Sequence, residues 1–175
     1  MTKDPSDLAR FIRDIPDWPK PGILFRDITP LLADPQALRA GVDAMCAPYR
    51  DAAVAYVAAV EARGFIFGTA VAARLNAGFV PIRKQGKLPF ETVGVTYDLE
   101  YGTDTIEVHR DAVPAGAKVL MVDDLLATGG TMKAACDLAA KVKGEIVGIT
   151  CLIELTDLGG RERLAPYDIH TVISY

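Results

Sequence analysis

The sequence predicts an α/β fold with a central, mainly parallel β-sheet flanked by helices. Four short, continuous apolar runs with β-branched residues support this prediction, at residues 52–60, 77–83, 117–124 and 145–155. Runs of this length without polar alternation are typical of strands that are covered on both faces. Apolar residues at helical spacing follow the first and third runs, as expected for βαβ units.

Two helices are predicted before the first run. Asp4 and Pro5 suit a helix cap and first turn, and apolar residues then repeat at helical spacing from Leu8 to Ile15, ahead of Pro16. A second helix is predicted to begin at Asp34-Pro35 and to stop at Pro48.

Two segments of alternating polarity, residues 93–99 and 105–108, lie where a further βαβ unit would place a helix. We expect them to form a β excursion from the main sheet, with His109 on its solvated side. In open α/β sheets the ligand binds at the carboxyl ends of the strands. The residues that follow each apolar run are therefore the first candidates for a functional site.

Length and composition predict one globular domain that spans residues 1–175. The chain has a net charge of -4 and a pI near 5.2, which disfavours a nucleic-acid-binding protein. The three cysteines, Cys46, Cys136 and Cys151, are far apart and predict neither a disulfide framework nor a zinc site. We expect them to be buried thiols of a cytoplasmic protein.

Several other classes are disfavoured by missing motifs. The first dozen residues lack the apolar segment of a secretory signal, and Glu61 and Arg63 interrupt the most membrane-like stretch, residues 52–73. Only two serines occur, Ser6 and Ser174, and neither G-x-S-x-G nor H-E-x-x-H is present. A membrane protein, a serine hydrolase and a zinc enzyme are therefore not expected.

The strongest local signal is the segment from Asp123 to Thr131, which follows the third apolar run and leads into a helical pattern. Adjacent glycines let the backbone turn tightly, and a helix N-terminus favours an anion such as phosphate. The two carboxylates cannot bind the same phosphate and must face hydroxyls, a metal ion or a cation. A ribose 5-phosphate meets both demands.

A purely structural interpretation of this segment stays open at this point, because acids and glycines are also common in turns. The segment is neither a P-loop, since no G-K-[ST] follows, nor a dinucleotide motif, since no G-x-G is present. ATP hydrolysis and NAD chemistry are disfavoured.

The segment VLMVDDLLATGGT resembles the phosphoribosyl pyrophosphate (PRPP) motif of type I phosphoribosyltransferases, in the form seen in the adenine phosphoribosyltransferase family. Five more segments of that family recur in the same order: PDWPKPGILFRDITPLL, EARGFIFG, IRKQGKLP, YDLEYG and LIEL. The resemblance implies the type I fold, with a small N-terminal hood over the base and a β flap.

It further implies a glycosyltransferase reaction of purine salvage, in which adenine and PRPP give AMP and pyrophosphate. The implied cofactor is Mg²⁺, held mainly by PRPP and water with no direct protein ligand. The implied assembly is a homodimer, with adenine and PRPP as the small-molecule partners.

The same resemblance assigns the PRPP-binding residues. Asp123 and Asp124 would hold the ribose hydroxyls, and carboxylates there would stabilise positive charge that develops on the sugar. Arg63 would bind pyrophosphate and assist catalysis, although this chain has Ala62 where the family often has a serine. The 5-phosphate would be bound by the loop residues Ala127, Thr128, Gly129, Gly130 and Thr131.

Arg83, Lys84 and Lys87 would also bind pyrophosphate, with Arg83 reaching across a dimer interface. Without the resemblance, these three cations would be interpreted as a solvated turn, and Arg63 as a surface arginine. Glu100 and Tyr101 would lie in the flap, with Glu100 giving acid–base or electrostatic help and Tyr101 shielding the site. Alone, they would be a solvent-facing pair.

The adenine pocket would be formed by Leu24, Phe25 and Arg26 on one side and Leu155 on the other. Backbone N–H and C=O groups there could distinguish adenine from 6-oxopurines. From apolar periodicity alone these would be core residues.

Two alternatives remain open at this point. One is a PRPP-sensing regulator, which would need a nucleic-acid-binding surface. The other is a phosphoribosyltransferase for another base.

Overall fold

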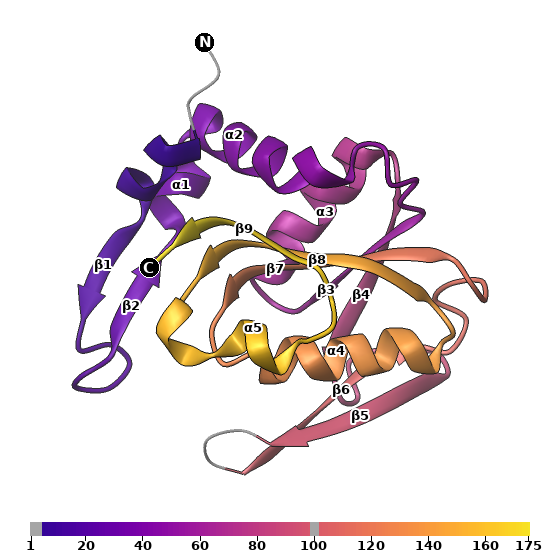
Figure 1. Cartoon of the computed structure of the whole chain (residues 1–175). Coiled ribbons are helices and arrows are strands. Elements are labelled where there is room, and N and C mark those ends of the chain that lie inside the picture. Colours follow the sequence, from indigo (N-terminus) through magenta and orange to yellow (C-terminus); the bar gives the residue numbers. More distant parts are fainter. Residues whose placement is uncertain (1–4, 99–101) are drawn as a thin grey trace.

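The computed structural model of the chain describes residues 5–98 and 102–175 and shows a β-sheet between two helical layers (Figure 1). The sheet has seven strands in the order β5-β6-β4-β3-β7-β8-β9. Five of them run parallel, and they are β3 (Tyr56–Val60), β4 (Gly78–Lys84), β7 (Lys118–Leu126), β8 (Glu145–Glu154) and β9 (Ile169–Ser174). The predicted α/β class is confirmed.

The two alternating segments form an antiparallel hairpin, β5 (Thr92–Asp98) and β6 (Thr103–His109). The hairpin joins the sheet where Arg83 and Lys84, at the end of β4, pair with Glu107 and Ile106 of β6. The predicted excursion therefore continues the main sheet at its β4 edge.

Helices cover both faces of the sheet. α2 (Pro35–Cys46) and α3 (Gly64–Leu75) lie on one face and α4 (Gly130–Lys141) on the other (Figure 1). The helical elements are η1 (Pro5–Phe11), α1 (Thr29–Ala33), α2 (Pro35–Cys46), η2 (Ala47–Tyr49), α3 (Gly64–Leu75), α4 (Gly130–Lys141), η3 (Thr156–Leu158) and α5 (Gly160–Arg163).

Strand β7 shows why both faces are covered. Its successive side chains point to opposite faces, so Val119 and Met121 join the core beneath α4, whereas Leu120 and Val122 join the core beneath α2 and α3. All four are buried. Burying each such side chain contributes about 1.5–3 kcal/mol relative to leaving it exposed, so the continuous apolar run specifies a central strand.

The predicted start of α2 is confirmed. The Asp34 carboxylate accepts hydrogen bonds from the N–H groups of Gln36 and Ala37 at 2.9 and 2.8 Å, and Pro35 occupies the first helical turn. A side-chain cap of this kind satisfies N–H groups that have no partner inside the helix.

The N-terminal helix was predicted to continue through Ile15, and this is wrong. The helix η1 is a 3₁₀ helix that ends at Phe11, and β1 (Arg13–Pro16) pairs antiparallel with β2 (Leu24–Asp27). Arg13 binds Asp27 across this pair at 2.7 Å. The pairing depends on residues 8 to 14 positions away, which outweigh the local helical spacing.

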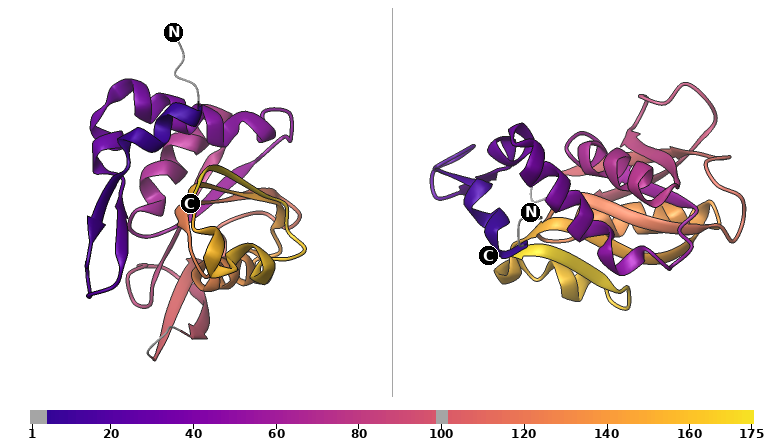
Figure 2. Two further views of the ribbon diagram at one scale, coloured as in Figure 1. Left: turned by 60° about the vertical axis from the view of Figure 1, so that its left-hand side comes forward. Right: turned by 90° about the horizontal axis from the view of Figure 1, so that it is seen from above.

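The β1–β2 hairpin lies beyond the carboxyl ends of β7, β8 and β9, where the arrowheads of these strands point (Figure 1). Figure 2 shows from two further sides that the hairpin stands at the margin of the sheet. The N-terminal segment is therefore placed near the edge where a ligand is expected.

All three cysteines are buried free thiols, as predicted. Burial raises the pKa of Cys46 to about 11 and that of Cys136 to about 12, and it also raises the pKa of Cys151. Thiols of this kind behave as small apolar core residues.

The helices in the described part of the chain are all too short or too polar to cross a membrane.

Candidate functional site

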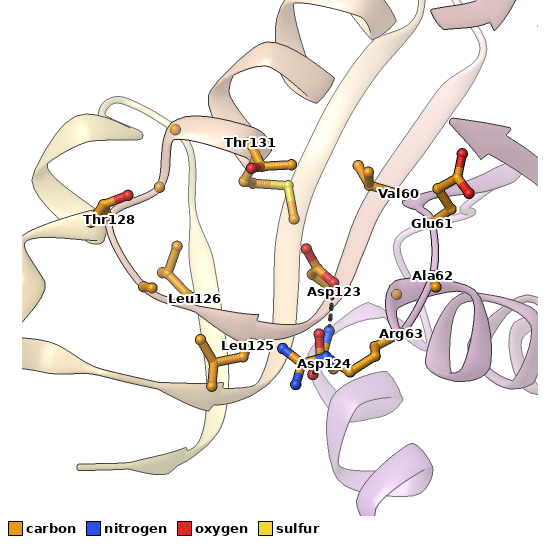
Figure 3. Close-up of a pocket in the computed structure, with 15 residues that line it drawn as sticks. Val60, Glu61, Ala62, Arg63, Asp123, Asp124, Leu125, Leu126, Thr128 and Thr131 are labelled. Atoms are coloured by element: carbon orange, nitrogen blue, oxygen red, sulfur yellow. Dashed lines mark hydrogen bonds and ion pairs between the residues drawn. The ribbon is translucent and has the colours of Figure 1, made fainter. Parts of the chain in front are cut away.

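A cavity of about 450 Å³ opens at the carboxyl edge of the sheet, between the ends of β3 and β7 (Figure 3). Two segments line it, residues 60–64 and residues 123–132. Parallel strands bring their carboxyl ends to the same edge, so segments about sixty residues apart meet there. The cavity joins Arg63 with Asp123, Asp124 and the loop 127–131, as the sequence predicted.

The two acids lie in the strand and not in the loop after it. The apolar run covers residues 117–124, and β7 extends beyond it to Leu126 because its pairing with β8 continues to Glu154. Asp123 and Asp124 therefore point to different faces of the sheet, and the side chain of Asp123 lies among the cavity residues (Figure 3).

Asp124 is buried, with 4% of its surface exposed, and its Oδ2 lies 3.0 Å from the Nε of Arg63. The Arg63 N–H does not point at Oδ2 closely enough for a hydrogen bond. Oδ2 therefore has no hydrogen-bond partner among the described residues. Asp123 Oδ1 accepts the N–H of Asp124 at 2.9 Å. The pair thus has acceptor capacity that a hydroxyl-bearing ligand could satisfy.

Burial raises the pKa of Asp123 well above its usual range, and the neighbouring charge of Asp124 adds to the effect. Burial likewise raises the pKa of Asp124, although the Arg63 guanidinium acts in the opposite direction. Two acids held this close with few donors are costly to ionise, which is typical of functional sites.

The loop between β7 and α4 has the geometry of an anion site. Gly129 adopts φ 77°, a left-handed conformation that favours glycine, and α4 begins at Gly130. The first N–H groups of α4 have no partner within the helix and carry partial positive charge. Thr131 Oγ1 donates to the Tyr97 hydroxyl at 3.4 Å, which ties the loop to β5.

Arg63 connects this cavity to the predicted adenine residues. It lies at the start of α3, and its guanidinium stands 5.2 Å from the centre of the Phe25 ring. Phe25 in turn packs edge-on against Trp18 at 4.4 Å. Such cation–π and aromatic contacts are each worth about 0.5–1.5 kcal/mol.

The other predicted adenine residues do not line the cavity. Leu24 is exposed, and Arg26 pairs with Asp14 and stands 3.7 Å from the Tyr175 ring centre. The N–H of Leu155 donates to the carbonyl of Leu126 at 2.9 Å, next to the loop of residues 127–131, called the phosphate-type loop below.

The three predicted cations do not line the cavity either. Arg83 and Lys84 lie at the end of β4, and Lys87 follows that strand. They gather on Glu61, a cavity residue that the sequence analysis did not assign: its carboxylate accepts the Lys84 N–H at 2.8 Å and lies 2.9 Å from Lys87 Nζ and 3.5 Å from Arg83 Nη2. Lys84 Nζ binds Asp104 at 3.0 Å. Burial acts to raise the pKa of Glu61, but these hydrogen bonds lower it below its usual value.

The expectation for His109 is confirmed only in part, because the residue is half-buried. Its ring packs edge-on against Phe90 at 6.1 Å, and its Nε2 is buried without a hydrogen-bond partner in the described part of the chain. It lines a second cavity together with Phe79 and Pro81 of β4. The alternation of polar and apolar residues in β6 does not reveal that these β4 residues lie nearby. The predicted flap residues Glu100 and Tyr101 lie outside the described residues.

Comparison with known proteins identifies the family. The model of the phosphoribosyl transferase domain matches residues 32–173. An adenine phosphoribosyltransferase of Rhodopirellula baltica is 59% identical over 97% of this chain and 82% of its own length. The chain belongs to the adenine phosphoribosyltransferase family.

Solved structures agree with this assignment. The adenine phosphoribosyltransferase of Rhodothermus marinus is 49% identical and superposes with a TM-score of 0.93 over 98% of both chains. That of Saccharomyces cerevisiae, 35% identical with a TM-score of 0.91 over 96% of this chain and 97% of its own, was crystallised with an imino-altritol bisphosphate and adenine. Both segments that line the cavity between β3 and β7 fall within the family match, and the predicted type I fold is confirmed.

Proposed function

We propose that the chain transfers the 5-phosphoribosyl group of PRPP to N9 of adenine, which gives AMP and pyrophosphate in purine salvage. One observation carries this proposal beyond family membership. A helix N-terminus suited to phosphate and two carboxylates with free acceptor capacity share one cavity, and that combination fits a phosphorylated ribose.

In this proposal, the 5-phosphate is bound by the backbone N–H groups of residues 127–131 and by the hydroxyls of Thr128 and Thr131. Asp123 and Asp124 accept hydrogen bonds from the ribose hydroxyls. Arg63 binds pyrophosphate from the opposite wall of the cavity, and its guanidinium suits bidentate phosphate contacts.

The displacement places positive charge on the sugar. As the bond from C1 to the pyrophosphate oxygen breaks, N9 of adenine attacks C1 with its lone pair, and the pyrophosphate leaves with the electrons of the broken bond. The two carboxylates stabilise the oxocarbenium-like ribose at this stage. Glu100 is proposed to assist as an acid–base or electrostatic group, and Tyr101 to shield the site from water.

Adenine is proposed to bind between Leu24, Phe25 and Arg26 of the N-terminal hood and Leu155 after β8. The contact between Phe25 and Arg63 supports this placement, since it puts the hood strand next to the pyrophosphate side of the cavity. The hood would thereby belong to a single domain that spans residues 1–175.

Mg²⁺ is proposed as the cofactor, carried mainly by PRPP and water. No group of three or more His, Cys, Asp or Glu side chains suited to a metal occurs within residues 5–98 and 102–175, whereas the acid pair suits hydroxyl donors. When bound, the ion neutralises charge on the leaving pyrophosphate. Arg83, Lys84 and Lys87 are proposed to bind the same group, with Glu61 holding Lys87 and Arg83 in position beside the cavity.

A cytoplasmic homodimer is proposed as the working form. Phe90 and Ile66 are 62% and 41% exposed, and large apolar side chains at a surface favour an interface with a second copy. Arg83 would then reach the partner's site. The three buried thiols suit a reducing compartment.

The deciding experiment measures AMP formation from adenine and PRPP with Mg²⁺, with hypoxanthine, guanine and xanthine as alternative bases. Turnover restricted to adenine is the expected result. Turnover of another base would reject adenine specificity and keep the reaction class. PRPP binding without turnover, together with tight DNA binding, would favour the regulator.

A further inference from the structure

The short helix α5 packs directly against the phosphate-type loop. A Cβ atom added to Gly160 would lie 2.2 Å from the Ala127 carbonyl oxygen, and one added to Gly129 would lie 2.8 Å from the Gly160 carbonyl oxygen. Two backbones can approach this closely only where neither has a side chain in the way. The contact fixes the position of α5 relative to the loop.

This packing brings Arg163, at the end of α5, over the first residue of α4. Its Nη1 and Cζ atoms lie 3.5 and 3.7 Å from the position that a Cβ of Gly130 would take. A Cα–Cβ bond is about 1.5 Å long, so Nη1 of the guanidinium lies no more than about 5 Å from the Gly130 Cα. That backbone carries one of the N–H groups that would bind phosphate.

The Arg163 side chain is exposed and forms no hydrogen bond or ion pair with any residue that the structure describes. Its neighbour Arg161 differs, since it binds both oxygens of Glu154 and donates to the Ile169 carbonyl at 2.9 Å. Arg161 therefore anchors α5 to the sheet and leaves Arg163 available for another contact.

The position of the Arg163 guanidinium beside the N-terminus of α4 favours the binding of an anion between them. A helix N-terminus carries a partial positive charge, so a cation beside it is electrostatically unfavourable. An anion bound between the two would turn this repulsion into two attractions. A guanidinium also offers paired N–H donors that match phosphate oxygens.

We propose that Arg163 binds the 5-phosphate of PRPP and AMP, together with the backbone of residues 128–131. The assignment rests on the proposed function, and it adds a phosphate ligand from a segment that the sequence analysis did not place at the site. The side chain needs only to turn about its flexible stem to reach a phosphate on the loop.

The test uses Arg163→Gln, Arg163→Met and Arg163→Lys, because the methionine keeps the packing of the stem and the lysine keeps the charge. Arg110→Gln is the control, since Arg110 is exposed, pairs with Glu91 at 3.5 Å and gives the same change in net charge. Dissociation constants are measured for AMP, ribose 5-phosphate and adenine, and thermal unfolding confirms that each variant is folded.

We expect Arg163→Gln and Arg163→Met to bind AMP and ribose 5-phosphate about 5- to 30-fold more weakly, with adenine binding unchanged. Arg163→Lys should recover part of the loss, and Arg110→Gln should match the unsubstituted chain. Unchanged phosphate binding in Arg163→Gln would overturn the proposal, as would an equal loss of adenine binding or a loss in Arg163→Gln that Arg163→Met does not share.

This test separates the two proposals. An unsubstituted chain that makes AMP, with an Arg163→Gln variant that binds both phosphates normally, overturns only the role of Arg163. An unsubstituted chain that makes no AMP overturns the proposed function, while ribose 5-phosphate binding still reports whether Arg163 holds the phosphate.

Discussion

Substitution of Gly160 by alanine is expected to displace the loop of residues 127–131, although Gly160 itself takes no part in the reaction. The new Cβ would lie 2.2 Å from the Ala127 carbonyl oxygen, whereas such atoms essentially never come closer than 3.0 Å. The two backbones must therefore separate by about 0.8 Å, the difference between these distances. The new Cβ cannot avoid this contact by shifting towards Leu126, because the Cδ1 atom of Leu126 would already be 3.0 Å away.

Two magnitudes follow from this displacement. Overpacking of a tight contact costs about 1–3 kcal/mol of stability, which lowers Tm by roughly 3–10 °C in a chain of this size. A misplacement of about 1 Å at a binding loop can reduce the rate about 100-fold. We expect kcat/KM for PRPP to fall by about 10- to 100-fold, with the affinity for adenine much less affected.

The assay combines steady-state AMP formation at varied PRPP with thermal unfolding. Gly94→Ala in β5 is a matched control, because its Cβ would meet neighbours at ordinary contact distances of 3.5–3.6 Å. A Gly160→Ala variant with unchanged Tm and unchanged KM for PRPP would refute the argument that this glycine contact positions the loop.

Two further predictions concern acids that are partly buried beside the cavity. Asp123→Asn should lower the rate of AMP formation about 100-fold, and it should also raise Tm at neutral pH. Because burial raises the folded-state pKa of Asp123, its ionised form destabilises the fold above about pH 4, so the gain in Tm should grow with pH and vanish in acid; a gain that is independent of pH would contradict this. Glu61→Ala should raise KM for PRPP about tenfold, because Lys87 and Arg83 lose their anchor, and Glu61→Gln, which keeps an acceptor for the Lys84 N–H, should have a smaller effect. The pKa of Glu61 is lowered in the fold, so its stabilising contribution should be lost as pH falls below about 4, and Tm measured across pH 3–7 checks this.

The central strands could be predicted because their signal is local. Each residue of a doubly covered strand must be apolar, so the runs that became β3, β4, β7 and β8 are visible without knowledge of their neighbours. The loop 127–131 was visible for a similar reason, since turn glycines and a helix start follow one another in the chain. The strand β9 was not predicted, although four of its six residues are β-branched; it is short and only partly buried.

What the sequence could not predict depends on contacts between distant segments. Ile15 has helical spacing, yet it forms a strand because Phe25 pairs with it. Glu61 gives no local sign that it will collect groups from residues 83–87, and Gly159-Gly160 would only have indicated a turn. His109 is packed by Phe90 from an adjoining strand connection, which alternation cannot reveal.

The three buried cysteines can be used as probes of local opening of the fold. Cys46 lies in α2, Cys136 in α4 and Cys151 in β8, so one thiol is placed in each helical layer and one in the sheet between them. A buried thiol reacts only while its surroundings open, and its labelling rate reports the free energy of that opening. Equal rates would mean that the layers open together, whereas a faster Cys46 or Cys136 would identify the layer that separates from the sheet first.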